Sequence, residues 1–315
     1  MKKHLSPLML LAAALIWGIA FVAQKAASVI TPFALGAART AIAVPVIALA
    51  VILFDKTSKN GRSLFSFRRG SQIVDVTRRE LIGGLICGAL LFVATSLQQF
   101  GLSDGTDAGK AAFITALYVI IVPIMSLLLR KNSPINAWCA VVIAVIGFYL
   151  LCVKSDFSIA PSDLTVFLCT FAFAAQIIAV DILLPTCDGV RISLIQFATV
   201  AILSTVCTFI FEGAAAFAPV IDCLPEILYL GVLSSGAAYT LQILGQKNTH
   251  PAVASVLLSL ESVFGALSGA IFLRETMTAR EYIGCAVVFL AVVLSQLDIK
   301  SILDRKKPPV PDNNA

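Results

Sequence analysis

The chain has 315 residues, of which 59% are hydrophobic and only 13% charged, and its mean hydropathy is +0.95. Soluble domains carry about 25% charged residues, so this composition excludes an ordinary soluble protein and predicts an all-α polytopic membrane protein. The net charge of +5 comes from basic residues between apolar runs, not on a polar domain. It therefore bears on membrane topology and suggests no nucleic-acid partner.

Ten apolar runs follow one another along the chain, and a helix needs about 20 such residues to cross a bilayer. The first run exceeds the 7–15 residues of a signal-peptide core, so we interpret it as a span rather than a cleaved leader. The predicted spans are Leu5–Ala27, Phe33–Phe54, Leu81–Leu102, Ala108–Leu129, Ile135–Val153, Leu164–Leu184, Ile192–Phe211, Leu224–Gly245, Ala252–Leu273 and Tyr282–Leu297. The sequence thus predicts ten transmembrane helices.

The distribution of basic residues predicts the orientation of these spans. With the N-terminus in the cytoplasm, 17 of the 23 Lys and Arg residues flank the inner ends of spans, and three lie in outer connections. This excess matches the rule that cytoplasmic loops are the more basic. We expect a multi-pass protein of the inner cell membrane with both termini in the cytoplasm. Residues 55–79 would form a basic cytoplasmic loop, and the proline-containing tail 298–315 would be disordered.

Two stretches of the chain resemble each other at a nearly constant spacing. Leu97-Gln98-x-Phe100-Gly101 matches Leu241-Gln242-x-Leu244-Gly245 at an offset of 144 residues, and Tyr118 falls on Glu261 when the offset changes by one. At a longer offset, Trp17 falls on Phe173. Chance similarity between apolar helices is the alternative explanation.

A repeat of five spans has a structural consequence. Because five is odd, the second unit must be inverted relative to the first, as in many secondary transporters whose substrate site lies between the repeats. We predict a first unit at 1–153 and a second, inverted unit at 154–297.

Glu261 is a carboxylate near the middle of the predicted ninth span. An ionisable group there costs about 2.5–3.5 kcal/mol on insertion scales, so it normally faces a protein interior or a watered cavity. The small residues around it, including Gly265-x-x-x-Gly269, also permit close helix packing. Both interpretations stay open, and we predict that Glu261 faces a substrate cavity as a partner for protons or a substrate amine.

Other polar residues within the spans extend this candidate site. Lys25, Arg39 and Lys110 fall in the predicted outer halves of their spans and would attract carboxylates or phosphates, although lysines also extend to lipid headgroups. Amide and aromatic groups would shape the cavity by hydrogen bonding and stacking, with plain interhelical bonding as the alternative. The predicted substrate-cavity residues are Trp17, Arg39, Gln98, Lys110, Tyr118, Tyr239, Gln242 and Glu261.

Signatures of catalysis or metal binding do not stand out. The eight cysteines are scattered singly, there are two histidines, and the chain has no HExxH, Walker A or GxSxG motif. We predict no enzymatic activity, no cofactor and no metal site.

Several segments together resemble one known family. They are Trp17-Gly18, Arg39, Asp107–Val119, and Ser259–Phe264 with Glu275 and Gly284. These segments resemble the EamA family of the drug/metabolite transporter superfamily, and the resemblance covers nearly the whole chain. It implies a ten-helix permease with a central cavity that works by secondary transport, often as an exporter of amino acids or other metabolites. Many members have proline where this chain has Tyr118 or Glu261, so a proline-dependent gate does not carry over.

We therefore expect a secondary active transporter that exports a small polar metabolite by alternating access, with protons as a candidate coupling ion. A passive channel, or a membrane scaffold that transports nothing, is the alternative. The choice between monomer and homodimer stays open.

Overall fold

The structure is a computed structural model that describes residues 5–57, 66–69, 72–75, 78–130, 133–152, 160–272 and 277–296. Most of these residues are helical. The α-helices are α1 (Leu5–Ala26), α2 (Pro32–Thr57), α3 (Arg78–Ser103), α4 (Ala108–Ala116), α5 (Tyr118–Leu128), α6 (Ile135–Cys152), α7 (Pro161–Leu183), α8 (Gly189–Cys207), α9 (Leu224–Leu228), α10 (Tyr239–Gln246), α11 (Pro251–Leu258), α12 (Glu261–Phe272) and α13 (Ala279–Gln296). Shorter 3₁₀ segments are η1 (Ala27–Val29) and η3 (Ala214–Val220), and π-helical segments are η2 (Thr208–Glu212) and η4 (Tyr229–Ala238).

Eight helical stretches in the described part of the chain are long and apolar enough to cross a membrane. A ninth, Ile135–Leu150, is apolar but shorter. Large apolar side chains such as Leu128, Phe211 and Ile271 are more than two-thirds exposed, as expected of surfaces that face lipid. The protein is therefore a multi-pass membrane protein.

The connection predicted as a plain loop at 55–79 contains secondary structure. Helix α2 extends to Thr57, strands β1 (Ser66–Arg69) and β2 (Gln72–Asp75) pair in antiparallel register, and α3 already begins at Arg78. The prediction of an all-α fold holds for the helical bundle, and this short hairpin in the connection was not predicted, because a pair of four-residue strands gives little hydrophobic periodicity to detect. The rest of this loop and the predicted disordered tail, 298–315, lie outside the described residues.

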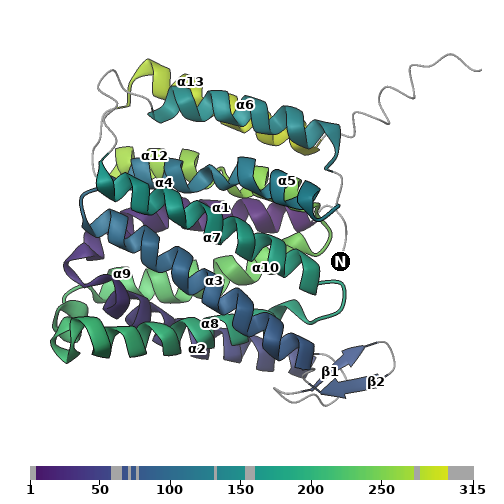
Figure 1. The fold of residues 1–315 in the computed structure, drawn as a ribbon, viewed down its shortest axis with the longest axis vertical. Helices are drawn as coiled ribbons and strands as arrows, with labels where there is room; N and C mark the ends of the chain where they lie inside the picture. The colour runs from purple at the N-terminus through teal and green to yellow at the C-terminus, as the bar shows by residue number, and fades with distance from the viewer. Residues whose placement is uncertain are drawn as a thin grey trace, which may run out of the picture.

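Helices α6 and α13 form a pair on one side of the bundle, and α2 and α8 lie on the opposite side (Figure 1). The Asn136 side chain at the start of α6 donates to the carbonyl oxygen of Ser295 at the end of α13, 2.9 Å away. Gly147, near the other end of α6, packs against Gly284 and Val288 near the start of α13. The two helices are therefore antiparallel.

Two of the predicted spans are broken in the middle, and they break at equivalent residues. The Leu117 N–H donates to Ile114 O at 3.1 Å, and 143 residues later the Leu260 N–H donates to Leu257 O at 3.4 Å. Each bond closes a tight turn in place of an α-helical one. In the second span, serine hydroxyls compete for the helix carbonyls, since Ser259 Oγ donates to Val256 O at 2.8 Å.

The two broken helices pack against each other in opposite directions. Helix α4 contacts α12, and α5 contacts α11. The small residues around the breaks permit this close approach, since a β-carbon added at Gly265 of α12 would lie 3.0 Å from that of Ala112 in α4. The Gly265 motif thus packs within one chain.

The sequence repeat is visible in helix contacts. A β-carbon at Gly101 of α3 would lie 2.8 Å from Ser162 O of α7, and one at Gly245 of α10 would lie 3.0 Å from Ser6 O of α1. The two glycines are 144 residues apart and their partners 156 apart. Glycine is needed at both places because the neighbouring backbone leaves no room for a side chain.

A second pair of glycines makes equivalent contacts, but the spacing between the two glycines is one residue shorter. A β-carbon at Gly88 would lie 2.7 Å from Gln196 O, and one at Gly231 would lie 2.8 Å from Arg39 O. These glycines are 143 residues apart and their partners 157 apart. The offset along this helix thus grows from 143 to 144 across the π-helical segment η4, as expected because a π-helix accommodates an extra residue.

Candidate functional site

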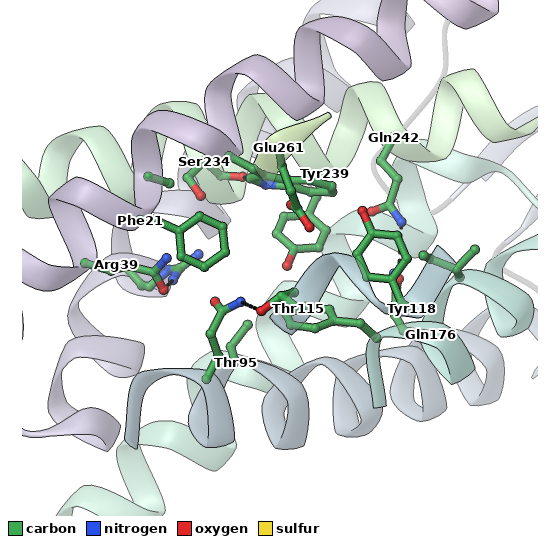
Figure 2. A pocket seen from close by; sticks show the side chains of 16 residues that line it. Phe21, Arg39, Thr95, Thr115, Tyr118, Gln176, Ser234, Tyr239, Gln242 and Glu261 are labelled. Carbon is green, nitrogen blue, oxygen red and sulfur yellow. Dashed lines mark hydrogen bonds between the residues drawn. The ribbon is translucent and has the colours of Figure 1, made fainter. Parts of the chain in front are cut away.

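A cavity lies among the helices near the two breaks, with about 490 Å³ of empty space, open solvent at its mouth included. Side chains from α1, α2, α3, α4, α5, α7, η4, α10 and α12 surround it. They are Trp17, Ala20, Phe21, Gln24, Arg39, Thr95, Gln98, Thr115, Tyr118, Phe173, Gln176, Ile177, Ser234, Tyr239, Gln242 and Glu261. Figure 2 shows these side chains pointing inward around a central space.

The structure brings together seven of the eight residues predicted from the sequence. They are Trp17, Arg39, Gln98, Tyr118, Tyr239, Gln242 and Glu261. The eighth, Lys110, does not line the cavity. What the seven do in function remains a prediction.

The residues that line the cavity follow the sequence repeat. Twelve of the sixteen lining residues fall into six pairs at the offsets already seen in the helix contacts. The pairs are Trp17 with Phe173, Ala20 with Gln176, Phe21 with Ile177, Thr95 with Tyr239, Gln98 with Gln242, and Tyr118 with Glu261. The cavity therefore lies where the two related halves of the chain meet, and Gln24, Arg39, Thr115 and Ser234 have no lining counterpart.

Glu261 contributes a buried carboxylate, of which 4% of the surface is exposed. It is the first residue of α12, where the N–H groups of the first helical turn favour negative charge. Its Oε1 atom and the hydroxyl of Tyr118 are both buried, and neither makes a hydrogen bond of good geometry, although the two side chains lie close enough to interact with each other. Buried polar atoms normally have well-formed hydrogen bonds, so these two oxygens at one cavity indicate a place for a ligand or water.

Arg39 contributes a buried cation whose hydrogen-bond partners are neutral. Its Nε donates to Ser235 Oγ at 2.9 Å, and its Nη1 donates to Gln24 Oε1 at 3.3 Å. Within the described part of the chain, no ion pair joins Arg39 to Glu261 or to another carboxylate. Figure 2 shows the two charged side chains entering the cavity from different directions. The cavity thus presents a cation and an ionisable carboxyl group that are not paired with each other.

Amide side chains form much of the remaining polar lining. Gln242 Nε2 donates to Gln176 Oε1 at 3.3 Å, and Gln176 Nε2 donates in turn to Gln196 Oε1 at 3.0 Å. The related Gln98 donates instead to Thr115 Oγ1 at 3.0 Å. The Oε1 atom of Gln242 is buried and has no partner, so it can accept a further hydrogen bond.

An aromatic wall lies beside these polar groups. The rings of Trp17 and Tyr239 have centroids 4.6 Å apart and are tilted by 59°. The indole N–H of Trp17 donates to Ser234 O at 3.2 Å, in the π-helical segment η4. This bond fixes the indole ring, so the wall has a defined shape toward the cavity.

The predicted role of Lys110 in the cavity does not fit its position. Its ammonium nitrogen lies 2.6 Å from Asp163 Oδ2, and Thr106 donates to the other oxygen of the same carboxylate at 3.1 Å. Lys25 is also engaged, since its Nζ donates to the carbonyl oxygens of Leu102 and Thr106. These lysines tie helix ends together and are engaged by acceptors of the protein itself, near the end of α3 or at the start of α7, where a substrate carboxylate or phosphate had been expected.

Some lining residues lay outside the predicted set. Gln24 and Gln176 are amides within predicted spans, and the repeat that relates Trp17 to Phe173 also relates Ala20 to Gln176, which is the sequence signal for the second of them. Ser234 gave no signal, because its place in the lining depends on the π-helical geometry of η4. The described residues contain no group of three or more His, Cys, Asp or Glu side chains that could hold a metal ion.

Comparison with known proteins adds independent information. The model of the EamA-like transporter family matches residues 4–153 and again 160–297. A protein of Archaeoglobus fulgidus described as an uncharacterized transporter is 30% identical over 301 residues, which cover 95% of this chain and 88% of that protein. A second uncharacterized transporter of the same organism is 35% identical over 71 residues, or 22% of this chain and 26% of that protein. One crystal structure, 18% identical, has the same fold with a TM-score of 0.72 over 94% of this chain and 98% of the other.

Proposed function

Since the chain belongs to the EamA-like transporter family, within the drug/metabolite transporter superfamily, we propose that it is a secondary active exporter of small zwitterionic metabolites such as amino acids. Its family and its named relative are those of transporters and not of enzymes. The substrate, the direction of transport and proton coupling are parts of the proposal.

The topology belongs to the same proposal. Residues 1–153 and 154–297 would form two units of five spans each, the second inverted relative to the first, with both termini in the cytoplasm. The antiparallel packing of α6 on α13 supports the inversion. The shorter α6 and its partner α13 would then complete ten crossings.

One observation carries the substrate class. Arg39 and Glu261, a buried cation and a buried group that can become an anion, line a single cavity and are not paired with each other. A buried charge is costly unless it meets an opposite charge with good hydrogen bonds. A zwitterion would meet both requirements at once, its carboxylate facing Arg39 and its ammonium group facing Glu261 and the Tyr118 hydroxyl.

The neutral groups of the cavity would refine this recognition. The free oxygen of Gln242 would accept from a polar group of the substrate, and the ring wall of Trp17 and Tyr239 would contact its carbon skeleton. When the cavity is empty, a proton on Glu261 would remove the cost of its buried charge. Substrate and proton would then compete for the same carboxylate, which gives the proposed coupling a physical basis.

Counterflow in proteoliposomes tests the proposal. Vesicles containing the purified protein are loaded with a single unlabelled amino acid from the standard set, and uptake of the same labelled compound is followed without an imposed ion gradient. We expect at least one amino acid to give transient accumulation that saturates with concentration. Uptake that rises linearly without counterflow would indicate a channel, and no protein-dependent uptake of any amino acid would overturn the substrate class.

A further inference from the structure

A second, narrower cavity lies beside the first, between α2, α3 and α8; its volume of about 360 Å³ includes open solvent at its mouth, so a ligand larger than water needs side chains to move aside. Arg39 and Thr95 line both cavities, so the two are separated by these side chains and not by a helix. Pro32, the first residue of α2, also lines the second cavity. This cavity therefore extends from the central one toward the Pro32 end of α2, which is the outer end in the proposed topology.

Arg39 and Gln99 are the two longest of the five polar side chains that line the second cavity; the others are Thr40, Thr95 and Ser96. Arg39 supplies a guanidinium group with five N–H donors, of which the Nε and one Nη1 donor are used by Ser235 and Gln24. Gln99 is 3% exposed; its Nε2 donates to Gln24 O at 3.3 Å and to Ser103 Oγ at 3.4 Å, while its Oε1 is buried and has no partner. The cavity thus combines a cation with an unused acceptor.

The requirements of these groups define a ligand. The guanidinium plane matches a carboxylate, which it can bind through two parallel hydrogen bonds. The unpartnered Gln99 oxygen requires a donor, such as the ammonium or hydroxyl group next to the carboxylate in an amino or hydroxy acid. The rest of the lining is uncharged: it combines the hydroxyls of Thr40, Thr95 and Ser96 with apolar side chains such as Leu91 and Phe197, so there is no second charged group to satisfy.

We propose that this cavity is a second binding site for a carboxylate-bearing ligand, in which Arg39 serves both cavities in turn. The guanidinium holds the carboxylate in the central cavity, rotates with it past Thr95, and presents it to Gln99 and Ser96 on the outer side. The identity of this ligand as the transported substrate rests on the proposed function. The existence of an anion-binding site between α2, α3 and α8 does not.

Thiol labelling tests the site without requiring transport. Ser96 lines the second cavity and not the first, so a Ser96→Cys variant of the full chain in detergent places a thiol inside it. We compare two methanethiosulfonate reagents of similar size, one carrying a sulfonate and the other a trimethylammonium group, and subtract labelling of the unsubstituted chain. The sulfonate reagent should react at least fivefold faster, and this ratio should fall to one or below when Arg39→Gln is added.

Two controls make the result specific. A cysteine at the exposed position Ala215 should show no dependence of the ratio on Arg39. If Arg39→Gln does not fold, the test uses the Ser96→Cys variant alone, where acetate should slow the sulfonate reagent at least twofold relative to the same concentration of chloride.

The outcomes separate this inference from the proposed function. A ratio that is unchanged when Arg39 is replaced, a preference for the cationic reagent, or no protection by acetate would overturn the second site. Charge-selective labelling in a protein that shows no amino acid counterflow would retain the site and overturn the proposed substrate class.

Discussion

Tyr118 and Glu261 occupy equivalent places in two broken helices, yet they bring different chemistry to the same cavity. Each is the first residue after its break, and each has a buried oxygen that makes no hydrogen bond of good geometry. Two of the remaining pairs have side chains of the same kind: Gln98 and Gln242 are both amides, and Trp17 and Phe173 are both aromatic. Equivalent positions of the two halves therefore line the cavity, and its ionisable groups stand where the residue types at equivalent positions differ.

Arg39 shows the same difference between the halves, because its counterpart is the neutral Gln196; the two residues are the backbone partners of the related glycines Gly231 and Gly88. Gln196 accepts from Gln176 within an amide network, whereas Arg39 is held by Ser235 on the π-helical segment η4. The π-helical segment η4, where the second half has one residue more than the first, is thus also the segment that binds Arg39, the cation that stands where the other half has the amide of Gln196. Two kinds of variant test whether equivalent positions form the cavity and unlike residues set its charge: those that make a pair of residues more alike, and those that disturb the helix packing common to both halves.

The largest effect is expected from Glu261→Gln, which removes the charge difference between the two broken helices. Flux in proteoliposomes should fall by about tenfold or more and lose its dependence on a pH gradient, because ionisable groups inside membrane proteins commonly form substrate or proton pathways. Asp222→Asn, a carboxyl-to-amide change at an exposed position, should leave both unchanged. Normal pH-dependent flux in Glu261→Gln would remove this residue from the mechanism.

Gly101→Ala and Gly245→Ala disturb what the halves share. Each introduces a β-carbon within 3.0 Å of a neighbouring backbone oxygen, so each should destabilise the fold by about 1–3 kcal/mol, as overpacking does. Thermal unfolding in detergent measures the loss. Gly109→Ala is the matched control, because nothing lies within 4 Å of its added β-carbon; unfolding temperatures equal to this control would contradict the equivalent packing.

The ion pair between Lys110 and Asp163 joins the two halves at one place only, since the positions related to them by the repeat are Val253 and Pro7, which cannot form an ion pair. A double-mutant cycle with Lys110→Met and Asp163→Asn should give a coupling free energy of about 0.5–1 kcal/mol, because the lysine is partly exposed and screened. Ligand affinity in the central cavity should not change. A loss of affinity comparable to that of Arg39→Gln would return Lys110 to the substrate site.

The smallest effect is expected from Trp17→Phe, which gives α1 the same ring that Phe173 gives α7. The variant loses one hydrogen bond to Ser234 O, worth about 0.5–1.5 kcal/mol, while an aromatic ring still faces the cavity. We expect a shift of a few-fold in the KM of counterflow with little change in maximum rate. Phe173→Trp is the reciprocal variant, and a larger effect there would place the defining contact in the other half.

Sequence alone determined a great deal here because lipid restricts the possible structures. Long apolar runs must be helical when no water is available to bond the backbone, so the positions of the helices followed from hydropathy. A charge within such a run must face protein or water, which drew attention to Arg39 and Glu261. The repeat linked Gln98 with Gln242 and Tyr118 with Glu261 before any contact was known.

Only the tertiary structure decided how these residues are used. Lys110 and Arg39 are both cations in predicted outer halves of spans, but only Lys110 has a carboxylate within reach, and that carboxylate is 53 residues away in sequence. The break before Glu261 coincides with serine hydroxyls that compete for helix carbonyls, while the break before Tyr118 and the π-helical turns of η4 lie where helices pack closely. A hydropathy profile predicts neither the helix breaks nor the π-helical turns, because both depend on contacts with neighbouring helices.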